Sequence, residues 1–402
     1  MSGLPARVLI VAGEASGDLY GSLVMRAMSG GGRPVEFAGI GGPSMRAAGI
    51  QALGDAGALG VTGFLEVLGS ARAIWGAYRD AGRRLSSPAA RPDLVLLIDY
   101  PDFNLRLAKK ARRNGVPVLY FISPQVWAWR KGRIGQIAGT VDRMLVILPF
   151  EEAIYRESGV PVEFVGHPLL DLVRVERTRD QALRPLGLDP KRPVVALLPG
   201  SRGNELQAHL PEMLGAAVLL RNEFRDLQFV LPVAPTLNSD EIRKRIEAAL
   251  GRGPGREPRG EGPGWALAGE NRYDAIAASD AAVVASGTAT LETALLGVPM
   301  VIVYRMNALT YALARLLSDV PHIGMPNLIA GERVVPELVQ GACTAPQIAR
   351  EVRRILTDPQ AAEAVRRGLA GVRSRLGRPG AIARVADAAW DMIRARRSER
   401  VA

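Results

Sequence analysis

The chain has 402 residues, which is long for a single hydrophobic core and sufficient for two domains. Lys and Arg number 51 against 40 Asp and Glu, so the net charge of +11 attracts anions such as nucleic acid, phosphorylated metabolites or an anionic membrane. The single cysteine, Cys343, excludes an intrachain disulfide, and three His offer no zinc-like spacing, so we expect a reducing compartment and no metal site.

The amino terminus leads straight into an apolar strand, without the apolar region of a signal peptide. No window reaches about 18 uninterrupted apolar residues, the length that a spanning helix needs. We therefore expect a cytoplasmic protein that is neither secreted nor membrane-spanning.

Apolar runs of strand length recur along the chain, and most are followed by turn residues and then a helical pattern. The first series covers residues 8–12, 35–39, 94–98, 116–122 and 144–148. The second series covers residues 194–198, 227–233, 265–268, 281–285 and 300–303. This alternation predicts an α/β fold of two doubly wound, Rossmann-like domains that face a cleft.

We place the first domain at residues 1–170 and the second at residues 193–365. Residues 171–192 are charged and lack a strong apolar pattern, so we expect a linker there. Residues 366–402 predict a C-terminal helical segment, and its return to the first domain is left open. The Gly- and Pro-rich stretch 251–264 cannot bury a face and predicts a loop.

The apolar run ending at Ile98 breaks into Asp99-Tyr100-Pro101-Asp102-Phe103-Asn104, which holds two carboxylates three positions apart. Ligands of open parallel sheets bind beyond the carboxyl ends of the strands, so these acids should face a crevice. Asp99 is our candidate catalytic base. The alternative is structural, with Asp99 closing a turn and Asp102 capping the next helix.

Loops after other strands of the first half supply further polar candidates. The stretch Gly13-Glu14-Ala15-Ser16-Gly17-Asp18 has neither the ending of a P-loop nor Gly-x-Gly-x-x-Gly spacing, so it does not predict a nucleotide cofactor site. We instead expect it, the Gly-rich loop 39–44 and the Trp-containing loop 123–130 to line the cleft. The cleft candidates are Glu14, Ser16, Asp102, Asn104, Gln125, Trp127 and His167. His167 competes with Asp99 as base, but its Gly-His-Pro setting better suits a structural hydrogen bond or a phosphate contact.

The second half holds two loops suited to a diphosphate. Residues 198–202, Leu-Pro-Gly-Ser-Arg, place a flexible turn and a guanidinium after a strand, where Arg binds phosphate in a bidentate manner. Residues 286–288, Ser-Gly-Thr, open a helix whose N–H groups favour an anion. The diphosphate candidates are Ser201, Arg202, Gly287 and Thr288. Glu292, one turn further, either accepts hydrogen bonds from ribose hydroxyls or complements the helix dipole.

Taken in order, these motifs resemble the lipid-A-disaccharide synthases, a bacterial glycosyltransferase family of the two-domain GT-B architecture. The matching stretches are residues 12–18, 98–104, 123–130, 166–168, 198–202, 286–292 and 326–331. The resemblance implies transfer of 2,3-diacylglucosamine from UDP to 2,3-diacylglucosamine 1-phosphate, which gives lipid A disaccharide 1-phosphate and UDP. It matches Asp99 to the family's essential acid and Arg202 to its essential arginine, and makes the first domain the acceptor side.

We expect a single direct displacement with inversion at the anomeric carbon, because no second carboxylate is clearly placed as a nucleophile. Arg202 and the N–H groups of Gly287 and Thr288 can stabilise the leaving UDP without a metal, so we expect no cofactor. The implied partners are a UDP-sugar lipid donor, a phosphorylated glycolipid acceptor and the inner leaflet of the cytoplasmic membrane, which the protein would bind peripherally. We expect no nucleic-acid partner. The sequence does not decide whether the protein forms a homodimer.

Residues 64–84 mix apolar side chains with four arginines and predict a helix. Such a helix either lies in a membrane interface or packs on a core. Because both substrates of the resembled family carry acyl chains, we favour the membrane interpretation. Its candidate residues are Phe64, Leu65, Leu68, Ile74 and Trp75.

Two other classes stay open. A UDP-sugar 2-epimerase of the same architecture would also show two such domains and a basic diphosphate site, but it needs no apolar entrance for acyl chains. A nucleic-acid-binding protein would explain the +11 charge. Against it, the basic residues are spread along the chain and are not clustered with aromatic residues on a recognisable motif.

Overall fold

The computed structural model describes residues 4–55, 64–126, 132–233, 238–249, 264–269, 271–307, 311 and 321–399, with only the backbone for residues 54–55, 64–74 and 249. The chain forms two compact units. The first combines Met1–Leu170 with Leu376–Ala402, and the second is Asp171–Arg375.

The first unit is built on a seven-stranded parallel sheet in the order β3-β2-β1-β4-β5-β6-β7. Its strands are β1 (Ala6–Ala12), β2 (Val35–Gly41), β3 (Gln51–Asp55), β4 (Leu94–Ile98), β5 (Val118–Phe121), β6 (Arg143–Val146) and β7 (Val162–Phe164). Its helices are α1 (Ala15–Ser29), α2 (Pro43–Ala47), α3 (Phe64–Ser86), α4 (Pro101–Arg113), α5 (Arg133–Ala138), α6 (Glu151–Glu157) and α17 (Ala381–Glu399), and α7 (Leu169–Leu172) ends just inside the second unit. The strand order reverses between β1 and β4, the position where open α/β sheets bind ligands.

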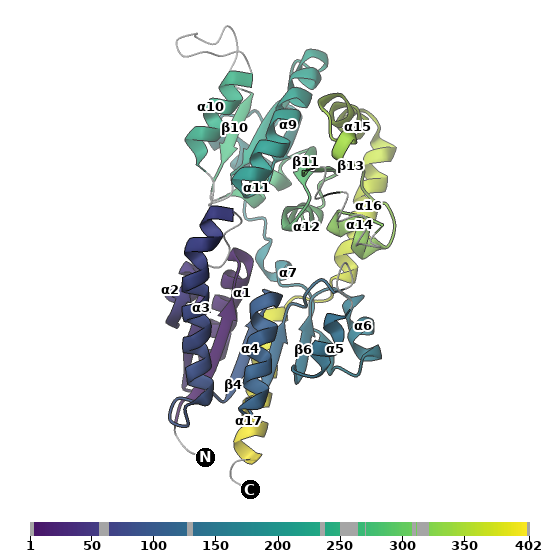
Figure 1. Ribbon diagram of the computed structural model, residues 1–402. Helices are drawn as coiled ribbons and strands as arrows, with labels where there is room; N and C mark the ends of the chain where they lie inside the picture. Colours follow the sequence, from purple (N-terminus) through teal and green to yellow (C-terminus); the bar gives the residue numbers. More distant parts are fainter. Residues whose placement is uncertain are drawn as a thin grey trace. The chain divides into compact units, whose positions relative to one another are not determined.

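Helices cover both faces of this sheet, so its central strands are buried on both sides. Every residue of β4 is buried, and α3 and α4 pack on one face through residues that include Ala81, Leu85 and Leu107. On the other face α17 passes behind β4 (Figure 1) and lies against α1. There the Trp390 indole N–H donates to the carbonyl of Met28 at 3.3 Å. Polar side chains can therefore reach solvent mainly at the strand ends.

The second unit holds a six-stranded parallel sheet in the order β10-β9-β8-β11-β12-β13. Its strands are β8 (Val194–Leu198), β9 (Gln228–Pro232), β10 (Trp265–Ala268), β11 (Ala281–Ala285), β12 (Met300–Tyr304) and β13 (Glu337–Val339). Its helices are α8 (Arg179–Leu183), α9 (Gly203–Glu223), α10 (Ser239–Ala249), α11 (Arg272–Ala277), α12 (Thr288–Leu295), α14 (Met325–Ala330), α15 (Ala345–Thr357) and α16 (Pro359–Arg375), with short 3₁₀ turns at Arg184–Leu186 and Gln340–Ala342. Two buried clusters pack on this sheet, one with α9 and α15 and the other with α8 and α11.

The structure places two segments differently from the sequence-based boundaries. Part of the expected linker, residues 171–192, packs in the second unit, because Leu183 and Leu188 are buried in its core. The expected C-terminal segment 366–402 starts ten residues later, at Leu376, because α16 is continuous to Arg375 and buries Leu369 in the second unit.

All ten predicted strands are confirmed, with shifts of a few residues at their ends. The strands β3, β7 and β13 were not predicted, and all three lie at sheet edges. β7 and β13 have three residues each, and β7 has no fully buried residue. β3 is as long as β4, but its sequence, Gln-Ala-Leu-Gly-Asp, begins and ends with polar residues, so none of the three strands has the apolar run that marks the central strands. The loop predicted at 251–264 lies outside the described residues, except for Gly264.

The loop after β2 is held by Asp18, a buried residue in the first turn of α1. Its Oδ1 accepts from the N–H groups of Gly42 (2.7 Å) and Met45 (3.0 Å), and its Oδ2 accepts from that of Ser44 (2.8 Å). A carboxylate from a different helix thus satisfies the first N–H groups of α2. The N–H groups of Gly42, Ser44 and Met45 therefore already have a hydrogen-bond acceptor within the protein.

We expect Asp18→Ala to lower the free energy of unfolding by about 2–4 kcal/mol, because it leaves two buried N–H donors and one partly buried N–H donor without their charged acceptor. Urea denaturation followed by circular dichroism measures the change. The control is Asp80→Ala, which removes a surface ion pair with Arg83 and should cost less than about 1 kcal/mol. Equal stability of the Asp18→Ala variant and the parent would contradict this role.

Candidate active site

In the first unit, three neighbouring strands deliver polar loops to one edge of the sheet. β1, β4 and β5 are adjacent and parallel, so Glu14, Asp99 and Ser123 follow strand ends that meet at the same edge. Glu14 and Ser16 are exposed, Asp99 is half-buried, and Ser123 is buried. The candidate base therefore lies at the sheet position expected for a ligand.

The backbone at this edge is unusual. Among the described residues, four that are not glycine have positive φ, and three of them are Asp99 (46°), Tyr100 (48°) and Ile122 (66°). Such conformations cost on the order of 1–3 kcal/mol each and persist where surrounding structure holds them. A β-branched residue such as Ile122 is rarer still in this region. Strain is thus concentrated just after β4 and β5.

The carboxyl group of Asp99 is harder to ionise than an ordinary aspartate. Burial, and then the negative charge of Glu14, raise its pKa from 3.8 to about 6, while the backbone N–H of Tyr100 acts in the opposite direction. Asp99 is consequently mostly ionised at neutral pH, but it binds a proton far more readily than a solvated carboxylate. A raised pKa of this kind suits proton transfer.

Tyr100 covers the loop after β1. A Cβ atom at Gly13 would lie 2.3 Å from Cγ of the Tyr100 ring, so only glycine leaves room for that ring. The ring also lies 5.8 Å from that of Phe103 in α4. Gly13 therefore leaves space for the Tyr100 side chain of the loop that carries Asp99.

The other cleft candidates are in different environments. Asp102 is exposed and pairs with Arg133 of α5, and Gln125 is exposed. Asn104 was expected to contact a ligand but is fully buried, and its amide donates to backbone carbonyls of the Asp99 loop. Trp127 lies outside the described residues.

His167 makes structural hydrogen bonds within the protein. Its Nδ1 accepts from the N–H of Leu169 at 3.1 Å, and its own backbone N–H donates to the carbonyl of Leu376. Burial lowers the pKa of the imidazole to about 3. The ring is neutral at physiological pH, and the backbone N–H of His167 joins the two chain segments of the first unit.

In the second unit, the loop after β8 carries Ser201 and Arg202 on the surface. Glu205, three residues further in α9, holds this loop, because its Oε2 accepts from the Ser201 N–H at 2.8 Å and its Oε1 lies 3.7 Å from the Arg202 guanidinium. A Cβ at Gly200, where φ is +121°, would lie 2.5 Å from Cβ of Glu205. Glycine is required at that position for both reasons.

A buried histidine ties this loop to a second strand end. His209 Nε2 accepts from the backbone N–H of Arg305 at 3.0 Å, so Nδ1 carries the proton and donates to the carbonyl of Pro199 at 3.1 Å. Burial lowers the pKa of His209, and this keeps the ring neutral. The ends of β8 and β12, which flank β11, are thereby joined.

The loop after β11 leads into α12, with Gly287 and Thr288 exposed at the helix start. The first turn of a helix leaves N–H groups unpaired within the helix. Glu292, further along α12, is 13% exposed, and its Oε1 accepts from the Tyr273 hydroxyl (2.7 Å) and the Arg272 guanidinium (3.0 Å). Burial and the charge of Glu292 raise the pKa of Tyr273 to about 12. Glu292 is therefore part of a partly buried polar cluster.

Sequence reasoning missed Tyr120, Glu205, His209 and the pair Arg272 and Tyr273. Glu205 has a usable signal, since an acid three residues after a loop arginine can reach back to the loop. Tyr120 has none, because a tyrosine in an apolar strand has the same pattern as a core residue.

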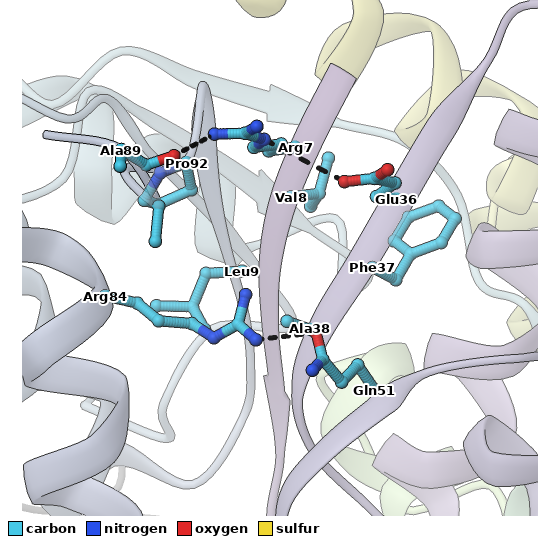
Figure 2. Close-up of a pocket in the computed structure, with 11 residues that line it drawn as sticks. Arg7, Val8, Leu9, Glu36, Phe37, Ala38, Gln51, Arg84, Ala89 and Pro92 are labelled. Atoms are coloured by element: carbon cyan, nitrogen blue, oxygen red, sulfur yellow. Dashed lines mark hydrogen bonds and ion pairs between the residues drawn. The ribbon is translucent and has the colours of Figure 1, made fainter. Parts of the chain in front are cut away.

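A cavity of about 230 Å³ lies elsewhere in the first unit, where β1 and β2 begin (Figure 2). Its arginines are paired within the protein: Arg84 donates to the Gln51 side chain at 2.6 Å, and Arg7 contacts the carbonyl of Ala89 and lies 3.8 Å from Glu36. Because it opens at the amino ends of the strands, it is separate from the Asp99 edge.

Within the described part of the chain, no group of three or more His, Cys, Asp or Glu is placed to hold a metal ion. No helix among the same residues is long and apolar enough to cross a membrane.

Comparison with known proteins decides the family. A family model described as lipid-A-disaccharide synthetase matches residues 8–369. The lipid-A-disaccharide synthase of Syntrophus aciditrophicus (strain SB) is 48% identical over 387 residues, which cover 96% of this chain and 98% of that protein. That of Geobacter metallireducens is 47% identical, with 96% and 97% covered. The chain belongs to the lipid-A-disaccharide synthase family. It is thus a glycosyltransferase of lipid A biosynthesis.

Solved structures share the fold of this synthase family member at low identity. UDP-GlcNAc 2-epimerase from Neisseria meningitidis superposes with a TM-score of 0.59 at 13% identity, covering 92% of this chain and 97% of that one. The calicheamicin glycosyltransferase CalG4 gives 0.59 at 16% identity, with 97% and 98% covered. The expected GT-B fold is confirmed. Since this fold serves both epimerases and glycosyltransferases, the sequence match, and not the fold, separates the two classes.

Proposed function

We propose that the chain transfers 2,3-diacylglucosamine from UDP to 2,3-diacylglucosamine 1-phosphate, with Asp99 as the general base. The observation that carries this proposal is the half-buried carboxyl group at the end of β4, whose pKa is raised to about 6 by burial and by Glu14. A base works best when its pKa lies near the operating pH.

In the proposed reaction the Asp99 carboxylate accepts the proton of the acceptor hydroxyl as that oxygen attacks the anomeric carbon of the donor sugar. The bond from the anomeric carbon to the diphosphate breaks in the same step, and UDP leaves. The configuration is inverted, because one displacement places the new bond opposite the leaving group. Glu14, Ser16, Asp102 and Gln125 are the proposed acceptor contacts, and all are exposed near the same sheet edge.

The second unit is the proposed donor site. Arg202 and the N–H groups of Gly287 and Thr288 would stabilise the charge that UDP gains, without a metal. Glu205 supports this role, because it accepts from the Ser201 N–H and lies beside the Arg202 guanidinium. Glu292 would accept hydrogen bonds from ribose hydroxyls through the carboxylate that Tyr273 and Arg272 already orient.

We further propose that the enzyme binds an anionic membrane surface through α3. Trp75 is 64% exposed and Arg79 lies over its ring at 5.4 Å, whereas Ala77 and Ala81 of the same helix are buried in the core. An exposed indole beside guanidinium groups is typical of an interfacial helix. The side chains of Phe64, Leu65, Leu68 and Ile74 lie outside the described residues and extend this proposal from the sequence alone.

Asp99→Asn should lower turnover by about 10²–10⁴-fold with little change in UDP affinity, because the amide keeps the shape but cannot accept the proton. Steady-state transfer assays and calorimetry measure the two quantities. Asp391→Asn on the surface of α17 is the control and should leave both unchanged. Near-normal turnover of Asp99→Asn would rule out Asp99 as the base.

The parent enzyme should lose kcat/KM below an apparent pKa near 6, because only the ionised carboxylate accepts a proton. Glu14→Gln removes the like charge and should move this acidic limb towards lower pH. A limb that stays in place in Glu14→Gln would show that another group titrates.

Arg202→Ala should weaken UDP binding and slow transfer together, since a charge-assisted contact strengthens as the leaving group gains charge. The matched control is Arg350→Ala, another exposed arginine of the second unit paired with a nearby glutamate. We expect EDTA to leave the rate unchanged. Full activity and unchanged UDP affinity in Arg202→Ala would place the diphosphate elsewhere.

Trp75→Ser should reduce co-sedimentation with anionic vesicles and raise the apparent substrate KM, and adding Leu68→Ser and Ile74→Ser should enlarge both effects. Leu219→Ser is the control, because Leu219 is an exposed apolar residue of α9 in the other unit. Vesicle binding equal to that of the parent, or unfolding of the triple variant, would assign these side chains to the core.

A further inference from the structure

The carbonyl group of Asp99 is held by two side chains that come from different elements. Tyr120 of β5 donates its hydroxyl hydrogen to this oxygen at 2.5 Å, and Asn104 of α4 donates an amide N–H to it at 2.7 Å. Asn104 also donates to the carbonyl of Ile98 at 3.2 Å. The last residue of β4 and the first residue of the strained loop are thus held together.

We propose that Tyr120 and Asn104 are positioning residues for Asp99, which fix the left-handed backbone at Asp99 and Tyr100 and thereby the direction of the carboxylate. This inference rests on the proposed role of Asp99 as base. It does not require that either side chain touch a substrate, and both are 0% exposed.

The hydroxyl of Tyr120 is the part of that side chain that needs an explanation. The residue lies in a four-residue strand whose members are all buried, in a core cluster where phenylalanine would supply a similar apolar ring. Burying a hydroxyl is unfavourable unless it is hydrogen-bonded, and here its acceptor is the Asp99 carbonyl. Burial, and then the charge of Asp99, raise the pKa of Tyr120 well above 10, so it remains a donor throughout the working pH range.

Tyr120 also connects the two strained loops. Ile122, with φ of 66°, follows it by two residues, and the backbone N–H of Asp99 donates to the carbonyl of Phe121 at 3.1 Å. The Asp99 loop is consequently tied to β5 through both its N–H and its carbonyl. Strained backbone persists where such contacts over-determine it.

The test is Tyr120→Phe, which removes only the hydroxyl. We expect kcat to fall about tenfold at unchanged UDP affinity, as the loss of one positioning hydrogen bond suggests. The acidic limb of the pH profile should move below 6, because a relaxed loop leaves the Asp99 carboxylate better hydrated. Asn104→Ala, with its fold checked by circular dichroism, should move kcat and the limb in the same directions.

The matched control is Thr140→Val, which removes the hydroxyl of another buried residue of the same unit. That hydroxyl donates to the carbonyl of Gln136 at 2.7 Å, so the control should lose stability but keep kcat and the pH profile. The inference is overturned if Tyr120→Phe keeps the parent's kcat and acidic limb, or if Thr140→Val shifts them equally.

A double variant separates this inference from the proposed function. In the Asp99→Asn background, Tyr120→Phe should cost no further activity, because there is no carboxylate left to position. Full turnover in Asp99→Asn alone would show that the base is assigned wrongly. Loss in Asp99→Asn with normal Tyr120→Phe kinetics would overturn only the positioning role.

Discussion

The structure depends on strands that are covered on both faces. In β4, β8 and β11 every residue is buried, so these strands have no room for solvated polar groups along their length. Parallel strands bring all their carboxyl ends to one edge of a sheet. The candidate site residues of both units are therefore found in loops after strands, Asp99 in one unit and Arg202 in the other.

The same constraint explains which parts of the fold were predictable. Doubly buried strands need uninterrupted apolar runs, and these runs marked the central strands of both sheets. The edge strand β13 (Glu337–Val339) pairs on one side only and has three residues, so its sequence carries no such run. The abrupt change from apolar run to carboxylate predicts Asp99 as the candidate base. No pattern predicts a role for Tyr120, because its hydroxyl bonds to a residue 21 positions away and sequence periodicity describes only local neighbours.

Several loops of this basic protein are held by carboxylates that accept backbone N–H groups. Asp18 holds the start of α2, Glu205 holds Ser201, and Glu337 accepts from Ile323 and Gly324. Glu337 also accepts from the amide of the fully buried Asn327, whose motif was recognised from the sequence alone. Charge-assisted bonds of this kind order a loop before any ligand arrives, which lowers the entropy lost on binding.

The first unit is discontinuous along the chain. Its last helix, α17, buries Val385, Ala389 and Ile393, and Arg397 near its end pairs with Asp93 at 2.9 Å. Roughly half of the protein is synthesised between β7 and this helix. On the ribosome, the sheet carrying Asp99 must therefore wait with part of one face uncovered until α17 emerges, while the second unit can already fold. Premature termination before α17 would leave a folded second unit joined to a first unit with exposed apolar surface, the kind of product that chaperones and proteases recognise.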